Sequence, residues 1–132
     1  MPELKPSAEV EKYQVEINRE ADLLIIRYAG RVGVAEVEQC FAATETALPS
    51  MRPGFRLLVD LTQLESMQPA CVPSIRKIMQ LCNQRGVSLV ARVIPDPTRD
   101  IGLQIMSYFH YGPAVRTITC ANLEEAEKIL FA

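Results

Sequence analysis

Phe55-Arg56-Leu57-Leu58-Val59-Asp60-Leu61-Thr62 is the stretch of this sequence that decides its fold. An apolar run that ends in an aspartate and leads through a turn into a helix is typical of the central strand of an α/β sheet. We expect this strand to end at Leu61 and the following helix to begin near Cys71. Functional surfaces of such sheets lie where strands end and the next helices begin. We therefore expect the functional surface of this protein within residues 60–74.

The chain before this strand predicts a β-hairpin. Residues 13–17 alternate between apolar and polar side chains, which is the pattern of a half-buried strand. A polar turn over 18–22 separates them from a more apolar strand over 23–28, and Ala29-Gly30 ends that strand. Because the two strands are joined by a short turn, we expect them to pair.

The remaining segments alternate between helices and strands. Apolar residues recur every three or four positions in the two predicted helices over 34–47 and 72–85, and Gly86 is a plausible end of the second. The later segments are a strand over 87–94, a helix that begins at Pro97 after an Asp96 cap and stops at Gly112-Pro113, a strand over 115–119 and a helix over 123–130. Asn122, with Glu125 three residues later, predicts a cap for this last helix. The order predicts an α/β fold: one mixed, mostly parallel sheet of about five strands with about four helices.

Composition limits the class of protein. The 132 residues fit one domain and are 48% hydrophobic, which is enough for a full core. We expect residues 1–11 to form a flexible leader and residues 12–132 to form the domain. The net charge of −2 provides no basic field for nucleic acid. No apolar run approaches the roughly 20 residues of a membrane span, and the first residues lack the apolar core of a secretory signal, so we expect a cytoplasmic protein.

The sequence contains few groups for metal or nucleophilic chemistry. Its four cysteines form no Cys-x-x-Cys pair, and His110 is the only histidine, so no zinc-ligand spacing is present and we expect free thiols without a metal or cofactor. Cys71 near a helix start is a candidate nucleophile, but the base that it needs is far away in the sequence. We expect Cys71 to be structural and His110 to cap or pack at a helix end. No glycine-rich nucleotide motif occurs.

Two sets of charged residues each allow both a functional and a simpler, structural interpretation. Asp60, Asp96 and Asp100 follow strand ends and could together hold a hard cation, but turn and cap hydrogen bonds account for them more simply. Basic residues could form a patch for nucleic acid, but they fit a solvated surface better. These basic residues are Arg76, Lys77, Arg85, Arg92 and Arg99.

The chain resembles the STAS domain of bacterial anti-sigma-factor antagonists over roughly residues 13–131. The landmarks of this resemblance are the hairpin ending at Gly30, the strand Leu57–Thr62, the helix Ser74–Arg85 with Gly86-Val87-Ser88-Leu89 after it, and the ending Ile118–Ala126. The family typically has Asp-Leu-Ser after its central strand and Asp-Ser-Ser-Gly at the next helix start. Asp60-Leu61-Thr62 matches the first motif, and Gln68-Pro69-Ala70-Cys71 stands where the second would be.

This departure removes the family's phosphorylation switch from its usual place. The resemblance implies that a partner kinase, itself an anti-sigma factor, phosphorylates the first serine of the second motif, which would add negative charge at a helix start. Pro69 and Ala70 stand at the two serine positions and have no hydroxyl. A broader STAS-like group, related in topology to lipid-binding Sec14-type folds, has a variable loop here.

We therefore expect a non-catalytic regulatory module that docks onto a regulatory protein, such as an anti-sigma-factor kinase or a sensor. The expected docking residues are Ser66, Met67, Gln68, Pro69, Ala70, Cys71, Arg76 and Lys77. In this interpretation Met67 is an exposed contact residue, and the prolines stiffen the loop. The alternative is a binder of a small apolar ligand or lipid, with a cavity lined by Met67, Met79, Ile105 and Met106. The sequence leaves a homodimer open.

Overall fold

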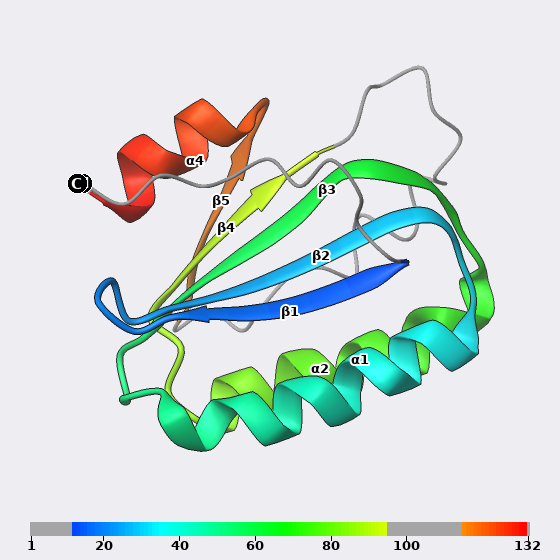
Figure 1. The fold of residues 1–132 in the computed structure, drawn as a ribbon, viewed down its shortest axis with the longest axis horizontal. Coiled ribbons are helices and arrows are strands. Elements are labelled where there is room, and N and C mark those ends of the chain that lie inside the picture. The colour runs from blue at the N-terminus through cyan, green and yellow to red at the C-terminus, as the bar shows by residue number, and fades with distance from the viewer. Residues whose placement is uncertain (1–11, 95–114, 132) are drawn as a thin grey trace.

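A computed structural model describes residues 12–94 and 115–131 of the chain and shows one five-stranded sheet (Figure 1). The strand order is β1-β2-β3-β4-β5; β1 is antiparallel to β2, and the other neighbours are parallel. This confirms the predicted hairpin and the mixed, mostly parallel sheet. The strands are β1 (Tyr13–Asn18), β2 (Leu23–Val32), β3 (Arg56–Met67), β4 (Leu89–Val93) and β5 (Arg116–Cys120).

The described residues contain three α-helices: α1 (Val34–Ala47), α2 (Val72–Gln84) and α4 (Leu123–Leu130). Helices α1 and α2 lie side by side on one face of the sheet, and α4 lies on the other face near β4 and β5 (Figure 1). The other expected helix, from Pro97 to Gly112, and the expected leader over 1–11 both fall outside the described residues. None of the described helices is long and apolar enough to cross a membrane.

The sheet separates two hydrophobic clusters. Leu24, Ile26 and Tyr28 of β2 point to the α1–α2 side, whereas Leu23 and Ile25 point to the α4 side. All five are buried, so β2 is a central strand covered on both faces. Burying one such side chain fully stabilises the fold by roughly 1.5–3 kcal/mol.

The predicted helix boundaries are confirmed at two ends. The backbone N–H of Glu125 donates to Asn122 Oδ1 at 2.9 Å, which caps the start of α4. Gly86 follows the end of α2 with a φ of +89°, a left-handed conformation that favours glycine. The Gly86 carbonyl accepts from the N–H of Gly54 at 2.7 Å and so joins the end of α2 to the turn before β3.

The ends of β2 and β3 correct the expected boundaries. We expected β2 to stop at Gly30 and the central strand at Leu61, but the two stay paired as far as Val32 and Met67. The register shifts twice, and each shift adds one residue to β3: Ala29 lies two positions after Arg27, whereas their partners Gln63 and Asp60 are three apart. The strand therefore continues through a segment whose sequence resembles a polar loop.

Candidate functional site

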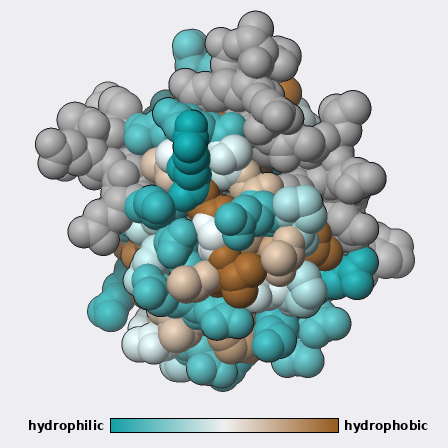
Figure 2. All heavy atoms as spheres, turned by 90° about the vertical axis from the view of Figure 1, so that its right-hand side faces the viewer, coloured by the Kyte–Doolittle hydropathy of each residue, from teal (hydrophilic) through white to brown (hydrophobic). Residues whose placement is uncertain are grey.

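The expected functional region lies at the end of the sheet where β2 leads into α1 and β3 leads into α2. Figure 2 views the molecule from this end and shows a small group of hydrophobic side chains surrounded by hydrophilic ones. A short 3₁₀ turn, Pro69–Cys71, precedes α2. This end of the sheet is the one that the sequence predicted to carry the functional surface.

Hydrogen bonds tie the loop after β3 to the end of β2. The backbone N–H of Gln68 donates to the Val32 carbonyl at 3.3 Å, and the Cys71 N–H donates back to the Gln68 carbonyl at 2.9 Å. The Cys71 thiol lies 3.8 Å from the same Val32 carbonyl oxygen. Gln68–Cys71 is therefore held in one conformation against β2.

The start of α1 lies against this loop. The N–H of Gly33 donates to Glu36 Oε1 at 2.8 Å, which satisfies one backbone donor at the helix start. A Cβ at Gly33 would lie 3.3 Å from Glu36 Oε1 and 3.5 Å from Gln68 Oε1. A side chain at position 33 would therefore crowd Glu36 and touch Gln68, so the start of α1 and the turn after β3 lie next to each other.

The structure divides the eight expected docking residues into two groups. Gln68, Pro69, Ala70, Arg76 and Lys77 are exposed, and Ser66 is half-buried. The other two, Met67 and Cys71, are buried at 4% and 0% exposure, so the expectation that Met67 is a surface contact is wrong.

Met67 is buried because β3 continues as far as this residue, which lies six positions after Leu61 and on the same face of the sheet. Leu61, Leu64 and Met67 are three positions apart, and an unbroken strand would send every second one of them to the opposite face. The first register shift, between Asp60 and Gln63, brings Leu64 to the face of Leu61, and the second, between Leu64 and Ser66, keeps Met67 on that face, so all three belong to the α1–α2 cluster. The candidate docking surface is thus the exposed turn Gln68–Ala70 together with Arg76 and Lys77; below we call these five residues the docking surface.

Cys71 does not have the environment of a nucleophile. Burial raises the pKa of its thiol; the backbone hydrogen bond with Gln68 opposes this shift, and the Glu36 carboxylate adds to it. The thiol therefore stays protonated and unreactive at neutral pH. His110 lies outside the described residues. All four cysteines are free and buried, and no cluster of metal-ligating side chains occurs among residues 12–94 and 115–131.

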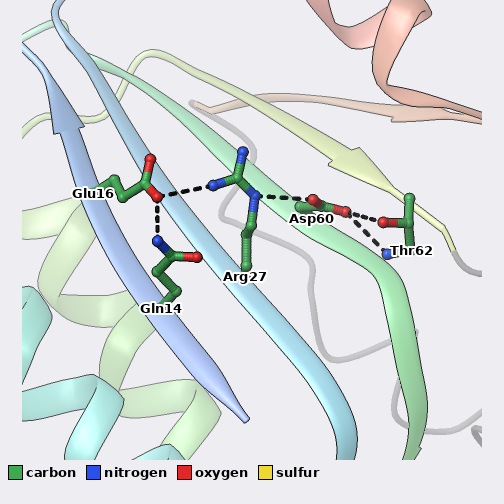
Figure 3. Close-up of polar contacts among 5 residues, drawn as sticks. All are labelled: Gln14, Glu16, Arg27, Asp60 and Thr62. Atoms are coloured by element: carbon green, nitrogen blue, oxygen red, sulfur yellow. Dashed lines mark hydrogen bonds and ion pairs between the residues drawn. The ribbon is translucent and has the colours of Figure 1, made fainter. Parts of the chain in front are cut away.

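Asp60 belongs to a partly buried polar network on the sheet face opposite α1 and α2 (Figure 3). Arg27 Nε donates to Asp60 Oδ2 at 3.1 Å, and Arg27 Nη1 donates to Glu16 Oε1 at 3.1 Å. The Thr62 N–H and hydroxyl donate to Asp60 Oδ1 at 3.0 and 2.7 Å, and the Gln14 amide donates to Glu16.

This network explains Asp60 as a structural residue. Both of its carboxylate oxygens accept hydrogen bonds, one of them from the backbone N–H of Thr62, as the simpler interpretation expected, but Asp60 lies within β3 and not in a turn. The partner Arg27 was missed by the sequence argument, although a single arginine within the apolar run 23–28 was the available signal. The other two carboxylates of the suggested cation site, Asp96 and Asp100, fall outside the described residues.

The alternative sites suggested by the sequence are not assembled by the described residues. Met67 and Met79, expected to line a ligand cavity, pack within the cluster between the sheet and α1–α2, whereas Ile105 and Met106 lie outside the described part. Of the basic residues, Arg76, Lys77 and Arg85 are exposed at α2 and its end, but Arg92 lies on β4 and donates to Thr119 Oγ1 at 2.7 Å. Arg99 also lies outside the described residues.

The fold, in contrast to the sequence, has clear counterparts among known proteins. No protein-family model matches the sequence, and no curated protein matches it. The anti-sigma factor antagonist SpoIIAA in its unphosphorylated form superposes with a TM-score of 0.63 at 20% identity, over 91% of this chain and 98% of that one. The Bacillus cell fate determinant SpoIIAA in its phosphorylated form gives 0.58 at 20% identity, over 89% and 98%.

A third solved structure agrees with these two. It is an uncharacterized protein of the DUF3478 family with a SpoIIAA-like fold from Shewanella loihica, with a TM-score of 0.67 at 19% identity, over 96% of this chain and 99% of that one. At such low identities the likeness concerns the fold. This chain therefore has the STAS-type fold of SpoIIAA.

Proposed function

We propose that this protein is a non-catalytic regulatory module that binds a partner protein through the docking surface, Gln68–Ala70 with Arg76 and Lys77. The observation that carries the proposal is the anchored and exposed turn after β3. It presents small and apolar groups to solvent while its backbone is hydrogen-bonded to β2. The shared fold supports the choice of class, because SpoIIAA is an anti-sigma factor antagonist.

The turn suits binding because its conformation is already fixed. Pro69 and Pro73 restrict the backbone on either side of Ala70, and the Gln68 N–H is held by the Val32 carbonyl. A rigid loop loses little conformational entropy when a partner binds. The exposed Pro69 and Ala70 can therefore contribute contact area at low entropic cost.

Charge at the start of α2 indicates what the partner presents. Arg76 and Lys77 are exposed near the positive end of the helix dipole, and the first turn of α2 contains no acidic residue. The docking surface is thus a small apolar turn beside positive charge. It fits a partner with an apolar contact flanked by carboxylates, in the class of an anti-sigma-factor kinase or a sensor-like regulator.

Control of this docking would not use the motif serine. Pro69 and Ala70 carry no hydroxyl, the side chain of Ser74 is buried, and the Thr62 hydroxyl donates to Asp60. A phosphate therefore has no acceptor at the two motif positions. We propose that occupancy of the surface depends on the amounts of the two proteins rather than on phosphorylation at this turn.

The test is capture of the partner from an extract of the native cells, with the tagged protein as bait. The informative variants are Ala70→Arg, which adds bulk and charge to the turn, and Lys77→Glu, which reverses a charge, since both positions are exposed. Lys128→Glu is the matched control: its side chain is 76% exposed and lies on α4, on the opposite face of the sheet. Met67→Asp is unsuitable because it would place a charge in the core.

We expect wild type and Lys128→Glu to retain the same protein, both variants of the docking surface to lose it, and phosphatase treatment to leave capture unchanged. If Ala70→Arg and Lys77→Glu retain the same partners as wild type, the docking surface has been misassigned. If wild type captures no protein, native mass spectrometry for a bound small molecule becomes the next measurement, because that result favours the ligand-binding alternative.

A further inference from the structure

The two helices that share one face of the sheet carry opposite charges. Helix α1 contains three glutamates and no lysine or arginine, whereas α2 contains Arg76 and Lys77, is followed by Arg85, and has no acidic residue. Glu38 and Glu45 of α1 are exposed, as are Lys77 and Arg85. The outer surface of this layer is therefore an acidic strip beside a basic strip.

Four of these charged residues, Glu38, Glu45, Lys77 and Arg85, form no ion pair within the described part of the molecule. The ion pairs Arg27–Glu16, Arg27–Asp60 and Lys128–Glu124 involve none of these four residues. Glu45 even lies in the last turn of α1, at the negative end of the helix dipole, where a carboxylate is unfavourable. Oppositely charged neighbours that do not pair with each other remain available for an outside surface of complementary charge.

We propose that this outside surface is a second copy of the chain, with α1 of each copy lying over α2 of the other. Helices α1 and α2 begin at the same end of the sheet and run in the same direction (Figure 1). A two-fold axis parallel to the helices places acidic α1 over basic α2 twice. A two-fold axis perpendicular to the helices, in the plane of the interface, would place α1 over α1, so that like charges would repel each other.

The spacing along the helices matches this arrangement. Glu38 and Glu45 are seven residues apart, about 10.5 Å at 1.5 Å per residue, and Lys77 and Arg85 are eight residues apart, about 12 Å. Glu38 lies four residues after the first residue of α1, and Lys77 lies five after the first residue of α2. When the first residues of α1 and α2 lie at the same height along the helix axes, Glu38 of one copy faces Lys77 of the other, and Glu45 faces Arg85.

Helix α1 also has an outer face that allows close approach. Ala35 and Ala42 are exposed on the side that carries Glu38 and Glu45. Because the contacts are exposed charges and small side chains, the association is weak and depends strongly on salt. The dimer contact shares Lys77 with the docking surface, whereas Glu38 and Glu45 of α1 belong to the dimer contact alone.

Sedimentation equilibrium at several protein concentrations tests the proposal. We expect the association constant of the wild type to fall at least about tenfold when NaCl is raised from about 50 to about 500 mM. Two double variants reverse one strip each: the α1-reversed variant, Glu38→Lys with Glu45→Lys, and the α2-reversed variant, Lys77→Glu with Arg85→Glu. Each should be monomeric alone, and an equimolar mixture should form a one-to-one pair.

Combining all four substitutions restores complementary strips, so the quadruple variant should self-associate like the wild type. Glu124→Lys, on α4, is the charge control and should leave association unchanged. A wild type that stays monomeric at low salt, or double variants that self-associate as well as it does, would overturn the proposal. The α1-reversed variant retains every residue of the docking surface, so a failure here leaves the partner-capture result unaffected.

Discussion

The buried ion pair between Arg27 and Asp60 offers the sharpest test of how this sheet is held together. It joins β2 to β3, and its two side chains are only 4% and 5% exposed. Replacing Asp60 by leucine leaves the Arg27 charge buried, with the half-exposed Glu16 as its other carboxylate, and removes the acceptor for both Thr62 donors. Removing one partner of a buried pair costs about 3–5 kcal/mol, and we expect a loss of about 4 kcal/mol here.

The double variant Arg27→Met with Asp60→Leu provides the matched comparison. It removes both charges and fills the space with apolar groups, so we expect its free energy of unfolding to lie within about 1 kcal/mol of the wild type. The single and double variants therefore differ by about 3 kcal/mol, which is the signature of an uncompensated charge rather than of lost volume.

The assay is urea unfolding followed by far-UV circular dichroism, because the chain has no tryptophan to report by fluorescence. The reasoning is refuted if Asp60→Leu alone loses less than about 1 kcal/mol, since Arg27 would then not depend on its buried partner. It is equally refuted if the double variant is as unstable as the single one, because the loss would then come from packing.

Two further predictions concern the helix layer. Gly86→Ala forces a residue with a side chain to a φ of +89° and places its Cβ 3.3 Å from Pro53 Cα. We expect the free energy of unfolding in urea to fall by about 1–3 kcal/mol. The control Gln84→Ala, at an exposed position, should change it by under about 0.5 kcal/mol. Burial raises the pKa of the Cys82 thiol from 9.0 to about 12. As the pH rises, the unfolded chain therefore loses this proton before the folded protein does. The free energy of unfolding keeps its full value below about pH 9 and falls by about 1.4 kcal/mol per pH unit above about pH 9. Cys82→Ala should remove this part of the slope between about pH 9 and 11; an unchanged slope would mean that the thiol is not shielded in the folded state.

The regular elements of this fold were predictable because their signals are local. The three- and four-residue spacing of apolar positions defined Val34–Ala47, and alternation defined the hairpin of β1 and β2. The end of β3 was not predictable in this way. Leu61, Leu64 and Met67 are spaced by three, which is neither a strand nor a helix pattern, and only the register shifts against β2 make that spacing consistent with a buried strand face.

For the candidate site, the sequence indicated which residues connect β3 to α2 but not which of them are exposed. A strand that ends before a helix start indicated residues 60–74, and the exposed Gln68–Ala70 lies there. The burial of Cys71 depends on its contact with Val32, which is 39 positions earlier in the chain. The partner of Asp60 was missed for the same reason, because Arg27 is 33 positions away and pairing of this kind depends on the order of strands in the sheet.

Lys77 belongs to both proposed surfaces, and this overlap has a consequence for control. A chain without a hydroxyl at Pro69 or Ala70 needs another way to make docking reversible, and competition for Lys77 provides one. When a second copy covers α2, Lys77 pairs with Glu38 of that copy and is withdrawn from the regulatory partner. The α1-reversed variant keeps Lys77 but cannot pair with itself, so it should bind the captured partner more tightly than the wild type at equal, high concentration and equally well at concentrations where both are monomeric. Equal binding at all concentrations would show that the two surfaces do not compete, and occupancy would then depend on the abundance of the partner alone.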